Sequence, residues 1–323
     1  MSAALDQATT GTEKTEEGFV QEFLRHWQNL PSKWLFFGIL AAWLLLFHFF
    51  GNSTLGYIKT ASLFGWMDYT YSNSEDDAHG KLIPFVVLAL FWMKRRELLA
   101  IEKRHWWPAI SVLALGLFLH IGGFVVQQTR VSIVGFFVGL YGITGLIWGP
   151  KWLKTSFFPF LLFAFCLPLG TISETLTFPL RVLATNITTL ITHGIFGINV
   201  IQDGTRIFNP DGSYQYEVAA ACSGLRSLTA TLAIAVVYAF LSFQKPWKRL
   251  ILIASAFPLA VAANVFRLTT IIFSAEAFGQ EAGNFVHDSP WLSLLPYLPA
   301  IAGLLILGYF LREKEEQESN APC

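Results

Sequence analysis

The sequence predicts an all-α polytopic membrane protein, with about eight transmembrane helices and a small external β-hairpin. Of its 323 residues, 54% are hydrophobic and 14% are charged, whereas soluble domains carry about 25% charged residues. The apolar residues fall in long runs separated by polar segments. In a bilayer, such runs must satisfy their backbone hydrogen bonds internally, as helices do. The formal net charge is zero, so nothing in the charge balance points to nucleic-acid binding.

The same pattern divides the chain into a central domain and two tails. Residues 1–32 are polar and partly acidic, without the early apolar region of a cleavable signal peptide. We predict that they form a cytoplasmic tail ending in an amphipathic segment, residues 19–30, on the membrane surface. Residues 33–311 are expected to form the transmembrane domain, and residues 312–323 a second, charged cytoplasmic tail.

About eight apolar runs are candidates for the spans, and polar loops are expected between them. The runs cover residues 34–50, 82–93, 107–126, 131–148, 157–169, 221–243, 251–273 and 291–310. Long polar loops are predicted at residues 51–79 and 274–290, and the second of these contains no lysine or arginine.

The segment before the sixth run has two unlike parts. Residues 171–197 repeat apolar residues at roughly helical spacing among Ser, Thr and Asn, which is typical of an interfacial helix or of a poorly apolar span. Residues 205–208 and 213–218 resemble strands, and the Asn-Pro-Asp-Gly sequence at 209–212 is a strong turn signal. A β-hairpin is therefore expected immediately before the sixth run.

The lysine and arginine residues predict the orientation. With the N-terminus in the cytoplasm, most of the 22 basic residues lie on the cytoplasmic side, as the positive-inside rule requires. This holds if residues 171–218 stay outside as one unit. If residues 171–197 cross the membrane instead, the later runs invert and basic residues move outside. We favour the first arrangement, in the cytoplasmic (inner) membrane, with the start of the sixth run on the external face.

Cys222 lies where the polar hairpin segment meets the sixth run, beside Ser223 and one helical turn before Arg226. The start of a helix favours an anion, so a thiol there ionises more easily, and the thiolate is the reactive form. Cys166 and Cys323 lie within an apolar run and at the last residue. Three scattered cysteines do not make a disulfide framework or a zinc site, so we expect no metal and no cofactor.

Other segments place polar residues at the same membrane face. Arg267 lies within the seventh run, roughly 9 Å below its predicted outer end, and a charge at such a depth is usually functional or paired. Asn264, one turn earlier, is a candidate hydrogen-bond partner for Arg267. His287 precedes the eighth run, and Glu217 could orient a base. His79 follows an acidic cluster with which it could form a structural salt bridge.

These residue types suit acyl transfer. Cys222 would attack a peptide carbonyl and form a thioacyl intermediate. His287 would accept the thiol proton, and Arg267 would stabilise the thiolate or the oxyanion. Two other classes stay open. The first is a multi-pass transporter in which Arg267 and Arg226 bind an anionic solute. The second is a structural subunit of a polysaccharide-export complex, in which no single polar residue is essential.

Several motifs resemble those of the exosortase/archaeosortase family. Residues 220–228, Ala-Ala-Cys-Ser-Gly-Leu-Arg-Ser-Leu, resemble its cysteine motif, and residues 264–268, Asn-Val-Phe-Arg-Leu, resemble its arginine motif. The His-Asp pair at 287–288 resembles its histidine motif. Two further segments, 79–84 and 163–168, resemble the opening of an early span and a proline-ended span.

The resemblance implies a multi-pass cysteine protease or transpeptidase, with Cys222, Arg267 and His287 as its catalytic residues. Its partners would be exported proteins with a C-terminal sorting signal, made of a short motif, a transmembrane helix and a basic cluster. Its other partners would be an unknown lipid or polysaccharide acceptor and the membrane lipids. The residues with possible supporting roles are Arg226, Asn264, Ser223, Glu217 and His79.

Overall fold

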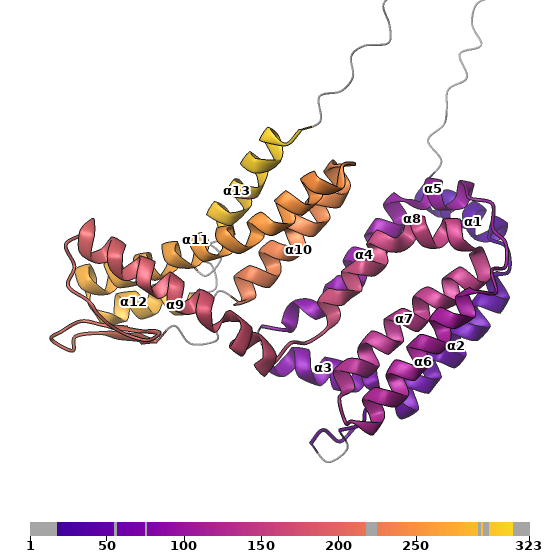
Figure 1. The fold of residues 1–323 in the computed structure, drawn as a ribbon, viewed down its shortest axis with the longest axis horizontal. Coiled ribbons are helices and arrows are strands. Elements are labelled where there is room, and N and C mark those ends of the chain that lie inside the picture. The colour runs from indigo at the N-terminus through magenta and orange to yellow at the C-terminus, as the bar shows by residue number, and fades with distance from the viewer. Residues whose placement is uncertain are drawn as a thin grey trace, which may run out of the picture.

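The computed structural model describes residues 18–54, 57–74, 76–217, 225–289, 292 and 297–312. Within these ranges it describes the backbone alone at residues 19, 29, 171–174, 176, 217 and 225–227. Most of the described chain is helical, and Figure 1 shows two groups of helices, one from each half of the sequence.

The first group, drawn in indigo to magenta in Figure 1, contains the helices before residue 170. They are α1 (Phe19–Asn29), α2 (Lys33–Phe50), α3 (Leu63–Asn73), η1 (Ala78–Lys81), α4 (Ile83–Met93), α5 (Arg95–Ala100), α6 (Ala109–Val125), α7 (Thr129–Trp148), α8 (Pro150–Leu161) and η2 (Leu162–Cys166). Small residues let α6 and α7 approach closely, as in many membrane helix pairs. A Cβ on Gly116 would lie 2.6 Å from the Gly139 amide nitrogen.

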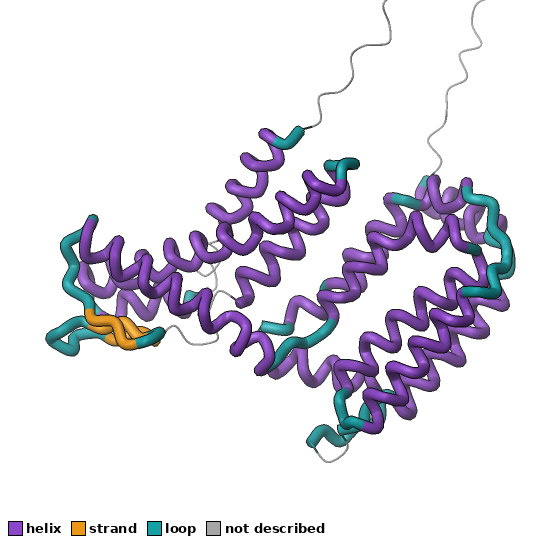
Figure 2. The backbone as a smooth tube through the Cα atoms, viewed as in Figure 1, coloured by secondary structure: helices purple, strands orange, loops and turns teal. Residues whose placement is uncertain are grey.

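The second group contains the remaining helices and the only sheet in the described chain. Its elements are α9 (Thr171–Gly194), β1 (Ile201–Asp203), β2 (Arg206–Phe208), β3 (Gln215–Glu217), α10 (Leu225–Ser242), α11 (Pro246–Phe278), α12 (Gln280–Asp288) and α13 (Tyr297–Phe310). The strands form an antiparallel sheet in the order β1-β2-β3. Figure 2 shows these strands as short orange stretches of the backbone tube near α9, which β1 and β2 contact.

Three described helices, α2, α7 and α11, are long and apolar enough to cross a membrane. The shorter apolar helices are α4, α6, α13 and residues 228–242 of α10. The chain is therefore an all-α membrane protein that carries a small sheet. Because α11 has 33 residues, it is about 50 Å long, well beyond the ~30 Å thickness of the hydrocarbon core.

Aromatic stacking connects the two groups, and two hydrogen bonds hold the chain just before α9. Phe158 of α8 stacks on Phe240 of α10 with their ring centroids 4.4 Å apart. Just before α9, the Leu169 amide donates to the buried Asp77 carboxylate over 3.0 Å. Arg130 of α7 donates to the Pro168 carbonyl over 2.8 Å. These contacts set where the chain enters α9.

The sheet is attached to the C-terminal part of α11. Ile207 and Tyr214 belong to the same buried cluster as Ile271 and Ile272 of α11. The Tyr214 hydroxyl also donates to Glu276 over 2.9 Å. Burial and this bond to a carboxylate raise the pKa of Tyr214, so the phenol stays neutral and continues to donate. The start of β3 is thereby held beside α11.

The predicted hairpin is confirmed, with one more strand than expected. Residues 206–208 and 215–217 pair across the turn, where Asn209 Oδ1 accepts a hydrogen bond from the Asp211 amide over 3.3 Å. The additional strand, β1, pairs with β2. Residues 171–194 form a single helix, α9, that continues through Pro179.

Two predicted loops are wrong. The segment 51–79 contains helix α3, and most of 274–290 is helical because α11 continues to Phe278 and α12 follows it. The polar character of this second segment suggested a loop. Its Ala, Glu and Gln residues are nevertheless good helix formers, and Gly279 turns the chain between the two helices with φ of 89°. The helix that contains the fifth apolar run, α8, begins earlier than predicted, because Pro150 occupies its first turn.

Candidate functional site

Arg267 and His287 lie together in the structure. Gly279 reverses the chain after α11, so that α12 folds back beside it (Figure 1). The Arg267 Nη2 donates to the backbone carbonyl of His287 over 3.3 Å. Two of the three predicted catalytic residues are therefore in contact, through a helix that the sequence did not predict.

The guanidinium of Arg267 retains unused donors. Its Nε atom is buried and has no hydrogen-bond partner among the described residues. In that same part of the chain, no carboxylate forms a salt bridge with Arg267. A buried donor without a partner costs about 1–3 kcal/mol. The arrangement leaves the cation available to an oxyanion or to a carbonyl oxygen.

His287 has an orienting carboxylate next to it in the sequence. The Nδ1 atom of its imidazole lies 2.6 Å from Asp288 Oδ1, and the imidazole side chain is 32% exposed. An ionised carboxylate accepts the hydrogen on Nδ1, which leaves Nε2 with the lone pair that a general base needs. Sequence reasoning gave Asp288 no role, although its position beside His287 was a usable signal.

Tyr216 of β3 packs against α12 and forms a hydrogen bond with it. Its hydroxyl donates to the Gln280 carbonyl over 3.3 Å. A Cβ on Gly283 would lie 2.0 Å from Tyr216 Oη and 2.9 Å from the Ala275 Cβ. Burial raises the pKa of Tyr216, and the negative charge of Asp288 raises it further. The sheet thus contacts the helix that carries His287.

Substituting Gly283 with alanine should therefore destabilise the protein. An alanine for glycine in a helix normally stabilises by about 0.5–1 kcal/mol, but overpacking costs about 1–3 kcal/mol. We expect a lower Tm of the purified protein in detergent. Asn284→Ala, at an exposed neighbour on α12, is the control and should leave the Tm nearly unchanged. A higher Tm for Gly283→Ala would contradict the close packing of Tyr216 on α12.

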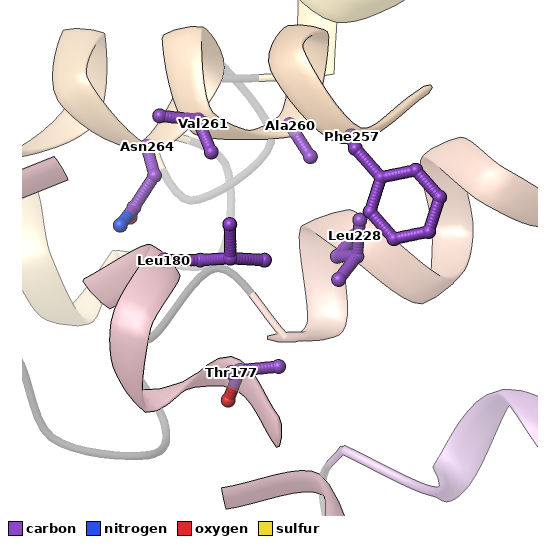
Figure 3. Close-up of a pocket in the computed structure, with 7 residues that line it drawn as sticks. All are labelled: Thr177, Leu180, Leu228, Phe257, Ala260, Val261 and Asn264. Carbon is purple, nitrogen blue, oxygen red and sulfur yellow. The ribbon is translucent and has the colours of Figure 1, made fainter. Parts of the chain in front are cut away.

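Asn264 does not have the predicted partner. Its side chain is 4% exposed, and no hydrogen bond joins it to Arg267, although both residues lie in the described part of α11. It lines a small pocket between α9, α10 and α11 (Figure 3). The pocket is lined by Thr177, Leu180, Leu228, Phe257, Ala260, Val261 and Asn264. The sequence gave no signal for these neighbours, because they come from three distant segments.

The predicted nucleophile lies outside the described residues. Cys222 and Ser223 belong to the segment 218–224, which connects the end of β3 to the start of α10. Arg226 is in the first turn of α10, and Glu217 ends β3, where its backbone pairs with that of Arg206. Nothing in the described chain tests the contacts of these four candidates.

His79 lies on η1 and is not hydrogen-bonded to Arg267 or His287 within the described chain. Its Nδ1 is 2.8 Å from the backbone carbonyl of Asp76. The nearby Asp77 carboxylate accepts a hydrogen bond from the Leu169 amide instead. The one hydrogen bond recorded for His79 within the described chain is therefore local to the turn that leads into η1.

One comparison with known proteins identifies the family. A family model described as "Transmembrane exosortase (Exosortase_EpsH)" matches residues 66–290. No curated protein and no solved structure matches the chain. The matched range covers more than half of the sequence and includes Cys222, Arg267 and His287. The chain therefore belongs to the transmembrane exosortase family.

Proposed function

We propose that this protein is a membrane-embedded cysteine protease and transpeptidase. It cleaves the C-terminal sorting signal of an exported protein and transfers that protein to an envelope or extracellular-polymer acceptor. The observation that carries the proposal is the contact between Arg267 and His287, with Asp288 on the Nδ1 side of the imidazole. These groups supply a cation and an oriented base for the Cys222 thiol.

The reaction has two halves. In the first, His287 Nε2 takes the thiol proton, and Cys222 Sγ attacks the carbonyl carbon of the scissile peptide. Arg267 stabilises the resulting oxyanion. The carbon–nitrogen bond then breaks as His287 returns the proton to the leaving amine, which leaves a thioester on Cys222.

In the second half, an acceptor nucleophile or water attacks the thioester. His287 accepts its proton, and the thiolate of Cys222 leaves and is restored. A hydroxyl or amine on a lipid or polysaccharide gives transfer, while water gives simple hydrolysis. No metal or cofactor takes part in this scheme.

The proposed topology places this chemistry outside the cytoplasmic membrane. The spans are α2, α4, α6, α7, α8 continued by η2, α10, α11 and α13, and α9 stays at the external surface. The positive-inside rule supports this orientation. The sheet and α12 then face the side where an exported substrate presents the residues that precede its transmembrane helix.

A processing assay tests the proposal. This protein would be co-expressed with a tagged exported protein from the same genome that bears a candidate signal of motif, transmembrane helix and basic cluster. We expect a shorter or modified product only when this protein is present. Mass spectrometry of its new C-terminus identifies the cleaved bond and the acceptor. Identical tagged products with and without this protein, for every candidate signal, would reject the proposal.

Substituting Asp288 with asparagine should lower kcat/KM for processing by about 10- to 100-fold. The amide preserves the shape of the side chain but removes the charge that holds the hydrogen on Nδ1. Asp203→Asn, at an exposed residue of β1, is the matched control and should be neutral. Equal kcat/KM values for the two variants would show that Asp288 does not orient His287.

A further inference from the structure

Helix α9 is apolar on its outward side and polar on its inward side. Leu183 and Leu190 lie on one face of the helix and are 46% and 73% exposed. The opposite face contains Thr185, Thr188 and Thr192, each with 0% of its surface exposed. A water-facing amphipathic helix has the reverse arrangement, with its apolar face against the core.

Two of the inward threonines are hydrogen-bonded within α9 itself. Thr185 Oγ1 donates to the Arg181 carbonyl over 2.9 Å, and Thr192 Oγ1 donates to the Thr188 carbonyl over 2.9 Å. These bonds reduce the cost of burying a hydroxyl group. The exposed side chains that the structure describes in α9 include no Lys, Arg, Asp or Glu. Arg181 is half-buried, with its guanidinium 5.7 Å from the centroid of the Phe178 ring.

Helix α11 carries a second exposed stripe without a charge. The stripe consists of exposed residues that recur on one side of the helix, namely Ile251, Pro258, Ala262, Phe266 and Phe273. It begins in a helix that is long and apolar enough to cross a membrane, and it reaches the part of that helix beside α9. Arg267 lies on a different side of α11 and bonds the His287 carbonyl.

The two stripes lie on the same side of the α9–α11 pair. The helices run side by side in the same direction (Figure 1), since Leu180 and Asn264 line one pocket. Further along, Phe196 contacts Phe273 with the ring centroids 5.5 Å apart. The stripes therefore form one surface, here called the α9–α11 surface, which comprises Pro179, Leu183, Leu190, Phe266 and Phe273.

Lipid acyl chains suit this surface better than water does. The residues that define the surface are all uncharged, and they continue the exposed side of a membrane-spanning helix. In membrane proteins, polar side chains turn toward the protein interior and apolar side chains face the lipid. The threonines and leucines of α9 follow this rule.

The length of α11 agrees with a lipid contact near its C-terminal end. Between Arg249 and Glu276, its only Lys, Arg, Asp or Glu residue is Arg267. The intervening segment, residues 250–275, is about 39 Å long as a helix, which exceeds the ~30 Å hydrocarbon core and is accommodated by tilting. A tilted α11 keeps Phe273, and α9 beside it, at the level of the membrane surface.

We propose that the α9–α11 surface lies in the outer leaflet of the membrane, with α9 parallel to the membrane plane and its leucines among the acyl chains. The sheet and α12 pack on the same part of α11, so this contact holds them next to the lipid headgroups. The choice of the outer leaflet rests on the topology of the proposed function, whereas the contact with lipid does not depend on catalysis.

Spin labels test the contact. Single cysteines would replace Leu183, Leu190 or Ser213 in the full chain with its three native cysteines changed to alanine, and each labelled protein would be reconstituted in liposomes. Power saturation then compares collisions with O2, which concentrates among acyl chains, and with a nickel chelate, which stays in water. Ser213 is exposed just after the hairpin turn and is the control.

We expect the labels at Leu183 and Leu190 to collide mainly with O2, at depths of about 5–10 Å below the headgroups. The label at Ser213 should collide mainly with the nickel chelate. The two depths on α9 should agree, because the helix lies in the membrane plane. A difference of about 10 Å between them, the rise between these residues along the helix, would show that α9 crosses the membrane and would overturn the inference.

Two other results would also overturn it. Collisions mainly with the nickel chelate at Leu183 and Leu190 would place the surface in water. Protection of both labels from both probes would show that a protein partner or a second copy covers the surface. Far-UV circular dichroism equal to that of the unlabelled protein establishes that each variant is folded.

A sidedness experiment distinguishes failure of this inference from failure of the proposed function. Ser213→Cys in the same background should react with a membrane-impermeant maleimide in right-side-out vesicles. If it reacts only in inside-out vesicles while the α9 labels lie in lipid, the proposed topology fails and the lipid contact stands. If processing depends on Cys222 but the α9 labels lie in water, the lipid contact fails and the mechanism stands.

Discussion

Replacing Cys222 with serine is expected to reduce processing by at least about 10³-fold, while the protein still inserts in the membrane at wild-type levels. The serine hydroxyl ionises far less readily than a thiol, and an imidazole matched to a thiol is a poor base for it. Cys222→Ala should lose activity to the same extent. The measurement is the rate of product formation from the tagged substrate, normalised to the amount of protein in the membrane.

The chain contains a matched control for this substitution. Cys166 of η2 is fully buried, and its thiol faces the Gly80 carbonyl at 3.8 Å. Cys166→Ala should lower stability moderately but leave the activity of the inserted protein intact. Equal processing by wild type and Cys222→Ser would reject the cysteine mechanism. Loss of function in an Arg267 variant together with normal function of Cys222→Ser would favour the anion-transporter alternative.

The second large effect is expected at Arg267. Arg267→Gln should lower kcat/KM by about 10²–10³-fold, the usual cost of removing a group that stabilises an oxyanion. Arg267→Lys should retain part of the activity, because lysine keeps the charge but loses the fork of planar donors. Both substitutions also replace the group that donates to the His287 carbonyl, so their Tm must be measured alongside the rate.

A substitution of Arg249 is the control that distinguishes an effect on catalysis from an effect on stability. Arg249 lies on the same helix as Arg267 and also donates to a backbone carbonyl, that of Phe243, over 2.7 Å. Arg249→Gln should therefore lower the Tm without lowering kcat/KM of the inserted protein. If Arg267→Gln lost only as much kcat/KM as Arg249→Gln, its role would be structural, and the proposed oxyanion contact would be wrong.

The sequence by itself was sufficient for features that depend on local chemistry. Membrane insertion follows from the apolar content of each run, which is a sum over neighbouring residues. The hairpin followed from its Asn-Pro-Asp-Gly turn, whose first side chain bonds the backbone two residues later. The motifs around Cys222, Arg267 and His287 were also readable locally, and the family match includes all three.

Only the tertiary structure decided which surfaces of these elements meet. The polar segment after Phe273 looked like a loop, yet α12 folds back on α11 and brings the His287 carbonyl to Arg267. Asn264 was paired with Arg267 by helical spacing, but its side chain faces a pocket completed by α9 and α10. Spacing along a helix sets which residues share a face. The partners of that face come from distant segments, and their positions depend on packing across the whole fold.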